Sequence, residues 1–162
     1  MVKLSSGLLL HREVGDEVQV LLVHPGGPFW AKKDDGAWSI PKGEHGPDDD
    51  PHATAIREFT EELGSPPPPA SPDPTVADDD LGFVRLASGK RIRCFARAAD
   101  FDATAISSNT FEQEWPPRSG QIQAFPEVDR AEWFPLPIAR VKLNPAQAEL
   151  IDRLEDQRAA AR

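Results

Sequence analysis

Apolar residues in this chain fall into short continuous runs that are separated by polar turns containing glycine. The stretch 5–10 ends in three leucines, and the stretch 18–23 is almost wholly apolar. Runs of this length predict buried strands, and the polar turn around Gly15 between them predicts a hairpin. The same reasoning predicts a short strand at 37–40, two strands at 81–86 and 90–98 that are joined at Ser88 and Gly89, and a last strand within 127–136.

Residues 51–63, between the predicted strands at 37–40 and 81–86, show a helical periodicity. Asp50 is a favourable N-cap, and Pro51 occupies the first helical position, where its missing N–H costs nothing. Gly64 suits the left-handed residue after the last turn, and the prolines that follow prevent continuation. The apolar face of this predicted helix carries His52, Ile56, Phe59 and Leu63, and a broadly opposite face carries Glu58, Glu61 and Glu62.

A second helical pattern lies near the end of the chain. A short helical turn is expected at 138–141. The sequence from Asn144 to Gln147 resembles a capping box, with Asn144 as the cap and a proline at the first helical position. It predicts a C-terminal helix over 144–158, with Leu150, Ile151 and Leu154 facing the core.

The chain has 162 residues, of which 39% are hydrophobic, and this size suits one domain spanning 1–162. Seventeen prolines and clustered acids indicate long polar loops. The clearest of these is the Pro-rich acidic connector at 65–80, which is too polar to form core. Neither a signal peptide nor an apolar run of membrane-spanning length is evident.

The net charge of −9 disfavours a protein that binds the nucleic-acid backbone through a basic surface. It leaves room for a small anionic substrate, because bound cations reverse the local sign. Cys94 is the only cysteine, so no internal disulfide is possible and a cytoplasmic location fits best. Since Cys94 lies in a predicted strand, we interpret it as a core residue.

The three glutamates of the predicted helix crowd into five positions on one face. Like charges at this spacing repel one another, and a hard divalent cation such as Mg²⁺ or Mn²⁺ removes the repulsion because it prefers oxygen ligands. The alternative is a solvated acidic face. Taken by itself, the Glu-x-x-Glu-Glu pattern favours that alternative.

The residues around these glutamates change the balance between the two interpretations. The pattern consists of Gly43, Arg57, Glu58, Phe59, Glu61, Glu62 and Gly64. In this register it resembles the signature of the Nudix hydrolases. Asp49 stands where the family has glutamate and Ser65 where it has an aliphatic residue; we expect Asp49 to pair with Arg57. The resemblance implies a mixed α/β fold, an α/β/α sandwich with a mixed central sheet.

The resemblance also implies a site and an activity. Glu58, Glu61, Glu62 and the backbone carbonyl of Lys42 are expected to hold Mg²⁺ or Mn²⁺, with Glu58 as the first candidate for the general base. The sequence of residues 38–43 resembles the corresponding segment in the diadenosine tetraphosphate hydrolase branch of the family. A dinucleoside polyphosphate is therefore the expected substrate. The alternatives are a nucleoside triphosphate pyrophosphatase and a non-catalytic nucleotide sensor. The family often adds a late-loop carboxylate, for which Glu112, Glu114 and Glu127 are candidates, and often forms homodimers.

Other residues are candidates for binding a nucleotide or polyphosphate. Phe29 and Trp30 lie in a loop rich in glycine and proline and are able to cover a base, unless they pack on the sheet. Guanidinium groups on the strand 90–98 are either solvated or line a phosphate cleft. The remaining candidates for substrate contacts are Lys32, Lys33, Arg93, Trp115, Arg118 and the ammonium group of Lys42.

Overall fold

The computed structural model describes residues 2–70, 72–73 and 76–161. Its centre is a six-stranded mixed sheet in the order β4-β5-β1-β2-β8, with β3 also paired to β1. The pairing of β1 with β5 is parallel, and the other pairs of this sheet are antiparallel. The strands are β1 (Leu4–Val14), β2 (Glu17–Pro25), β3 (Lys42–His45), β4 (Asp79–Arg85), β5 (Arg91–Ala98) and β8 (Val128–Pro135).

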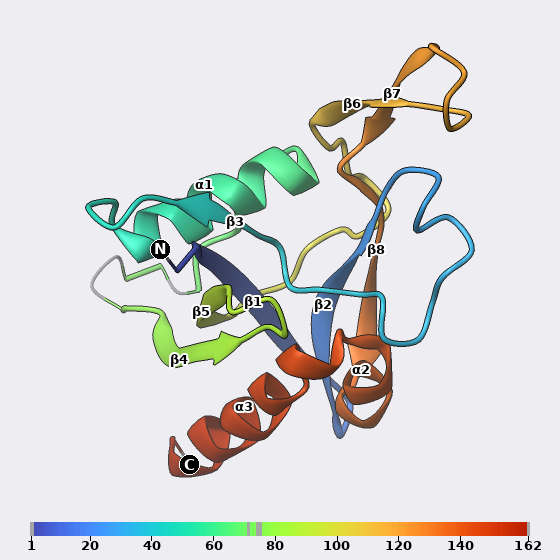
Figure 1. The fold of residues 1–162 in the computed structure, drawn as a ribbon. Helices are drawn as coiled ribbons and strands as arrows, with labels where there is room; N and C mark the ends of the chain where they lie inside the picture. The colour runs from blue at the N-terminus through green and yellow to red at the C-terminus, as the bar shows by residue number, and fades with distance from the viewer. Residues whose placement is uncertain (1, 71, 74–75, 162) are drawn as a thin grey trace.

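Apolar side chains of β1 alternate between the two faces of this sheet, so both faces must be covered. Helices cover them and form one core on each side. Leu8 and Leu10 pack toward α1 (Pro51–Leu63), whereas Leu9 packs on the opposite face toward α3 (Glu149–Ala160). Figure 1 shows α1 on one side of the sheet and α3 with α2 (Leu136–Lys142) on the other. The predicted α/β/α sandwich with a mixed central sheet is confirmed.

The predicted ends of the first helix are confirmed in detail. The side chain of Asp50 accepts a hydrogen bond from the amide of Ala53 at 3.1 Å, and Pro51 begins the helix. Gly64 adopts the left-handed conformation, with φ of 87°. A Cβ on Gly64 would also lie 2.6 Å from the carbonyl oxygen of Ser107. Both the left-handed backbone and this close contact therefore exclude a side chain at position 64.

The predicted strand at 37–40 is wrong. Trp38 and Ser39 make single bridges to Leu143 and Val23, and no continuous ladder follows. The backbone N–H of Ile40 donates to the side chain of Gln147 instead of to a strand. A true strand, β3, begins two residues later, where the sequence predicted a loop.

The C-terminal helix begins later than predicted. Asn144 caps a short 3₁₀ turn, η1 (Pro145–Gln147), by accepting from the amide of Ala146 at 3.0 Å. The α-helix itself starts at Glu149. The capping box is not formed, because the side chain of Gln147 points into the protein toward Ile40 rather than back to Asn144.

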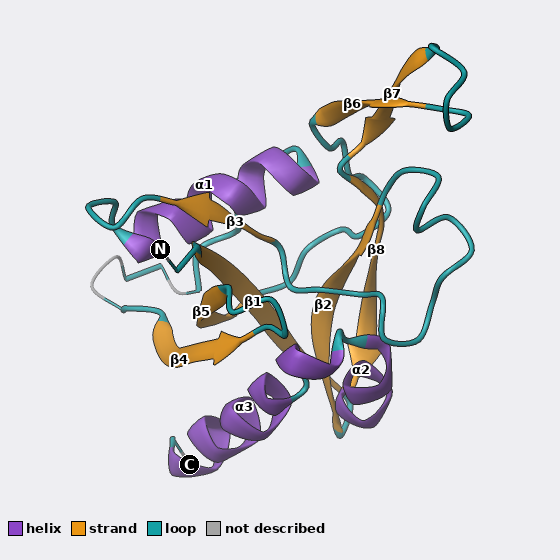
Figure 2. Cartoon of the chain, viewed as in Figure 1, coloured by secondary structure: helices purple, strands orange, loops and turns teal. Residues whose placement is uncertain are grey.

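A second small sheet projects from the body of the molecule (Figure 2). It is a hairpin of β6 (Thr110–Glu114) and β7 (Ile122–Pro126), so Glu112 and Glu114, which were expected in a late loop, lie on a strand. The prediction for Cys94 is confirmed, since it is fully buried in β5 and burial raises the pKa of its thiol. Among the described residues, no helix has the length and apolar character needed to cross a bilayer.

Candidate active site

The three carboxylates of α1 differ in exposure, and those of Glu58 and Glu62 contact the strand β3. The side chain of Glu58 is 14% exposed and that of Glu61 is 39% exposed. Glu62 is buried, with 8% of the whole residue exposed. This gradient follows from the helical turn between these positions, because Glu62 comes closest to the apolar face that ends in Leu63.

Side chains of α1 contact the backbone of β3. The carboxyl group of Glu58 rests on the α-carbon of Gly43 so closely that an added Cβ would lie 2.0 Å from its carboxyl carbon. The amide of Lys42 donates to Oε1 of Glu62 at 3.1 Å. Because the N–H and C=O of one strand residue point to the same side, the Lys42 carbonyl also points toward Glu62. The glycine of the signature is therefore required for close approach.

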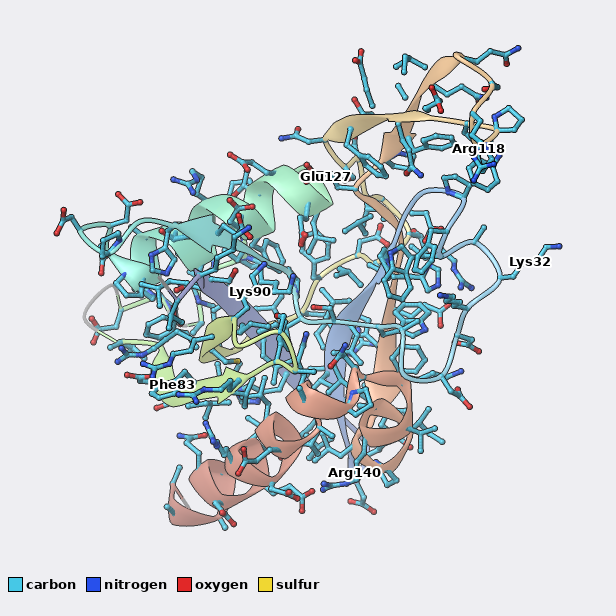
Figure 3. All side chains as sticks on the ribbon, viewed as in Figure 1. Lys32, Phe83, Lys90, Arg118, Glu127 and Arg140 are labelled. Atoms are coloured by element: carbon cyan, nitrogen blue, oxygen red, sulfur yellow. The ribbon has the colours of Figure 1, made fainter. Side chains whose placement is uncertain are left out.

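A fourth carboxylate, that of Glu127, is brought to the same place by the end of α1. The helix carbonyls of Glu61 and Leu63 accept hydrogen bonds from the amides of Asn109 (3.0 Å) and Ser107 (3.2 Å). The carbonyl of Asn109 in turn accepts from the amide of Glu127 at 2.8 Å. Figure 3 labels Glu127 beside the C-terminal end of α1. We call Glu58, Glu61, Glu62 and Glu127 the carboxylate array.

The electrostatics of the carboxylate array disfavour its full ionisation. Burial raises the pKa of Glu62 to about 8, against the hydrogen bond from the Lys42 amide. Burial also raises the pKa of Glu58, with further contributions from Glu61 and Glu127. The pKa of Glu127 is raised by desolvation and by Glu61. A bound cation would relieve the repulsion.

The donor set fits a hard divalent cation, because it consists of carboxylate oxygens and a backbone carbonyl. In the part of the chain that the structure describes, no three acidic, histidine or cysteine side chains converge into a ready-made ligand cluster. Mg²⁺ does not require one, since it keeps several waters and binds through one or two carboxylates and substrate phosphates. An open array of this kind suits a cation that arrives with a phosphorylated substrate.

The expected ion pair between Asp49 and Arg57 is not formed. The carboxylate of Asp49 accepts from the amide of Gly46 at 2.7 Å and closes its own turn. Arg57 instead contacts Glu58 at 3.2 Å and Glu61 at 3.7 Å. A short side chain in a tight turn satisfies its oxygens locally, which leaves the guanidinium to organise the helix carboxylates.

A lysine that the sequence did not single out, Lys90, lies beside Lys42. Alternation in β3 directs Gly43 toward α1 and Lys42 with Glu44 to the other face. Burial and the nearby Lys90 ammonium lower the pKa of Lys42. Lys90 also donates to Glu44 at 3.1 Å. No local sequence signal marks this pair, because it depends on how β3 and β5 flank β1.

The loop between β2 and β3 begins beside Glu127, whose carbonyl accepts from the amide of Gly26 at 2.9 Å. Its predicted base-binding aromatics contact each other edge to face, with ring centroids of Phe29 and Trp30 5.1 Å apart. The ammonium of Lys33 lies over the Phe29 ring at 3.6 Å. Lys32 points outward at the tip of the loop (Figure 3).

The remaining candidates lie outside the carboxylate array. Arg93 forms two hydrogen bonds to the carboxylate of Asp80 on the neighbouring strand. Glu112 is exposed on β6, and Glu114 accepts from the backbone amide of Arg118 at 2.9 Å within the hairpin loop. Figure 3 places Arg118 at the far end of this hairpin. The half-buried Trp115 also belongs to the hairpin loop.

Comparisons with known proteins agree with the fold. The family model of the NUDIX domain matches residues 2–154. Comparison with curated protein sequences found no match.

Solved structures share the fold at low sequence identity. The NUDIX domain of Shewanella oneidensis NrtR, complexed with ADP-ribose, is 20% identical with a TM-score of 0.63, over 97% of this chain and 88% of that one. A C. elegans Ap4A hydrolase in a binary complex is 16% identical with a TM-score of 0.64, over 96% and 98%. The E. coli ORF135 protein is 23% identical with a TM-score of 0.53, over 98% and 94%. The chain belongs to the Nudix family, whose hydrolases act on phosphoric anhydrides.

Proposed function

We propose that this chain is a pyrophosphohydrolase that uses Mg²⁺ or Mn²⁺ and cleaves a phosphoanhydride bond in a nucleoside diphosphate-linked substrate. Dinucleoside polyphosphates are the first substrate class we propose. The observation that carries the proposal is the carboxylate array, in which burial and mutual repulsion raise the pKa values of Glu58, Glu62 and Glu127. Such perturbed acids gathered in one place are typical of catalytic sites.

Each residue of the site has a proposed role. The carboxylate array and the Lys42 carbonyl would hold the divalent ions, which supply positive charge to the phosphoryl oxygens and lower the pKa of a bound water. Arg57 fixes the carboxylates of Glu58 and Glu61. Glu58 accepts the proton of the attacking water at its carboxylate, because a raised pKa suits a general base near neutral pH.

Three observations support a polyphosphate substrate. The side chain of Lys42 leaves β3 on the face turned away from α1, but its ammonium still interacts electrostatically with Glu58, Glu62 and Lys90 and can contact a phosphate oxygen. The loop that carries Phe29 and Trp30 starts next to Glu127 and offers aromatic rings to a base. Among the structural neighbours, one is an Ap4A hydrolase and another is complexed with ADP-ribose.

A second candidate, a nucleotide-binding sensor without turnover, is favoured by one observation. The guanidinium of Arg57 already contacts both Glu58 and Glu61. It therefore partly neutralises the helix without a metal. A sensor would bind nucleotide and release it unchanged.

The test is to incubate the protein with Mg²⁺ and a panel of dinucleoside polyphosphates, nucleoside triphosphates and nucleotide sugars, and to separate the products. A second reaction contains EDTA, a third uses Glu58→Gln, and a fourth uses the exposed-acid control Asp156→Asn on α3. We expect cleavage of dinucleoside polyphosphates in the wild type and in the control only. Binding of a nucleotide that is recovered intact from the wild type would favour the sensor.

A further inference from the structure

The segment from Ser39 to Pro41 leads into the proposed metal site without belonging to one of the strands, so other groups hold it. Ser39 exchanges backbone hydrogen bonds with Val23 at 2.9 and 3.0 Å. The carbonyl of Pro41 accepts from the amide of Leu8 at 3.2 Å. The remaining backbone donor before the proline, the N–H of Ile40, lies on the side facing away from the sheet ladder.

Gln147 supplies the partner for that donor. Its Oε1 accepts from the amide of Ile40 at 3.0 Å, and its Nε2 donates to the hydroxyl of Ser39 at 3.0 Å. The Ser39 hydroxyl itself donates to the Ile40 carbonyl at 2.7 Å. Gln147 is only 2% exposed, so water does not replace these contacts easily. Both ends of one side-chain amide are therefore used on two consecutive residues.

The backbone of Gln147 is fixed as firmly as its side chain. Its amide donates to the carbonyl of Asn144 at 2.8 Å, and the amide of Asn144 donates to the carbonyl of Trp38 at 2.8 Å. The N-cap of η1 is thus bonded to Trp38, the residue before the two that the Gln147 side chain holds. A rigid support of this kind can set the position of the segment rather than follow it.

The constraint passes from Ile40 to Lys42 through a single proline. The ring of Pro41 fixes its own φ and restricts Ile40 to extended conformations. Little torsional freedom remains between the amide that Gln147 holds and the Lys42 peptide, whose N–H donates to Glu62.

We propose that Gln147 is a positioning residue for the metal-binding carbonyl of Lys42, although it lies on the opposite side of the sheet from α1. The inference rests on the proposed function, in which that carbonyl is a metal ligand. Supporting groups outside the ligand set typically change metal affinity by about 10–100-fold when they are removed. Loss of Gln147 should therefore weaken metal binding without removing any ligand.

The test measures Mn²⁺ affinity by electron paramagnetic resonance, which separates free from bound ion without substrate. Gln147→Met keeps the size of the side chain and removes its amide. Two core variants on α3, Ile151→Val and Leu154→Ala, serve as controls for a general loss of thermal stability, because they remove none of the hydrogen bonds to residues 39–42. We expect Gln147→Met to raise the Mn²⁺ Kd by about tenfold, while both core variants keep the wild-type Kd.

A second variant covers the case in which Gln147→Met does not fold. Ser39→Ala removes the acceptor of the Gln147 amide and the hydroxyl's own bond to the Ile40 carbonyl, but it keeps the bond from the Ile40 amide to Gln147. A rise of about threefold in the Mn²⁺ Kd is therefore expected, at the low end of such supporting effects. A wild-type Mn²⁺ Kd in Gln147→Met would overturn the inference. If Gln147→Met does not fold, a wild-type Mn²⁺ Kd in Ser39→Ala would overturn it instead.

Glu62→Gln separates this failure from failure of the proposed function. If the wild type binds Mn²⁺ and Glu62→Gln does not, the metal site stands and the test of Gln147 is direct. If the wild type does not bind Mn²⁺, or if Glu62→Gln binds it equally well, the metal site and the inference about Gln147 fail together.

Discussion

The junction of α1 with β3 and the β6–β7 hairpin both carry acidic residues that the sequence marks as candidate ligands, but the two regions satisfy their acids differently. At the junction, Glu62 is buried and Glu58 rests on a glycine of β3. In the hairpin, Glu112 is exposed and Glu114 accepts from an amide of its own loop. Buried carboxylates that lie close to one another are destabilised in their ionised form, and a bound cation would relieve this. Exposed carboxylates are already stabilised by water.

The same contrast applies to the basic candidates. Arg93 is engaged by Asp80, and Lys33 lies on Phe29, so each has a local partner. Lys90 is paired with Glu44, but the pKa of Lys42 is lowered by burial first and by the charge of Lys90 second. The difference teaches that groups with unfavourable electrostatics in the free protein mark the site better than charge alone.

Among the variants that leave the carboxylates of α1 intact, the largest effect should come from Gly43→Ala. The new Cβ would lie 2.0 Å from the Glu58 carboxyl carbon, so the helix carboxylate must move. A displacement of this size is expected to lower kcat/KM by about 100-fold. Gly46→Ala is the matched control, since its Cβ would lie 3.4 Å from Asp49. Equal activities for the two variants would show that the junction does not require close approach.

A smaller effect should distinguish Glu127 from the hairpin acids. Glu127→Gln is expected to lower kcat/KM by about tenfold, since it removes one member of the carboxylate array. Glu112→Gln should change kcat/KM by less than about twofold, because exposed surface groups contribute little. Steady-state kinetics with Mg²⁺ measure both. The opposite order would assign the late carboxylate to β6.

The raised pKa of Glu62 predicts how stability depends on pH in the metal-free protein. A carboxyl group with a folded-state pKa of about 8 favours folding fully below its unfolded pKa, and this contribution is lost as pH rises through 8. We expect the free energy of unfolding to fall between about pH 4.5 and pH 8, by a few kcal/mol in order of magnitude.

Thermal melts with EDTA measure this decline. Glu62→Gln should reduce it, and Mg²⁺ should reverse it in the wild type by binding the folded state. A wild-type pH profile in the variant would show that Glu62 is not the group responsible.

The smallest effect is expected at the tip of the β2–β3 loop. Lys32 points outward into solvent (Figure 3), so Lys32→Ala should change KM by less than about twofold. Trp30→Ala is the informative comparison, because loss of a stacking ring should raise KM and leave kcat unchanged. A strong effect of Lys32→Ala on KM would extend the substrate site to the tip of this loop.

The sequence predicts α1 well because its signals are local. Asp50, Pro51 and Gly64 act within a few residues of the helix ends, and the structure uses each as expected. The hairpin of β1 with β2 is equally local, since Gly15 takes a positive φ of 62° between them. Such elements depend on backbone preferences that a short stretch of sequence carries.

Other features could not be predicted because they depend on contacts between distant segments. β3 exists only through its pairing with β1, and Lys90 approaches Lys42 only because β5 runs parallel to β1. Gln147 reaches Ile40 across 107 positions of sequence, so its pattern with Asn144 misleadingly resembles a capping box. Only the folded chain shows which polar group each of these residues faces.

The central claim is that the carboxylate array performs the hydrolysis, and the most direct test is turnover in Glu62→Gln. The measurement is kcat/KM for diadenosine tetraphosphate with Mg²⁺, beside circular dichroism to verify the fold. The account predicts a loss of about a thousandfold, the size expected when one electrostatic group of a transition state is removed. A folded Glu62→Gln with wild-type turnover and wild-type metal dependence would contradict the account.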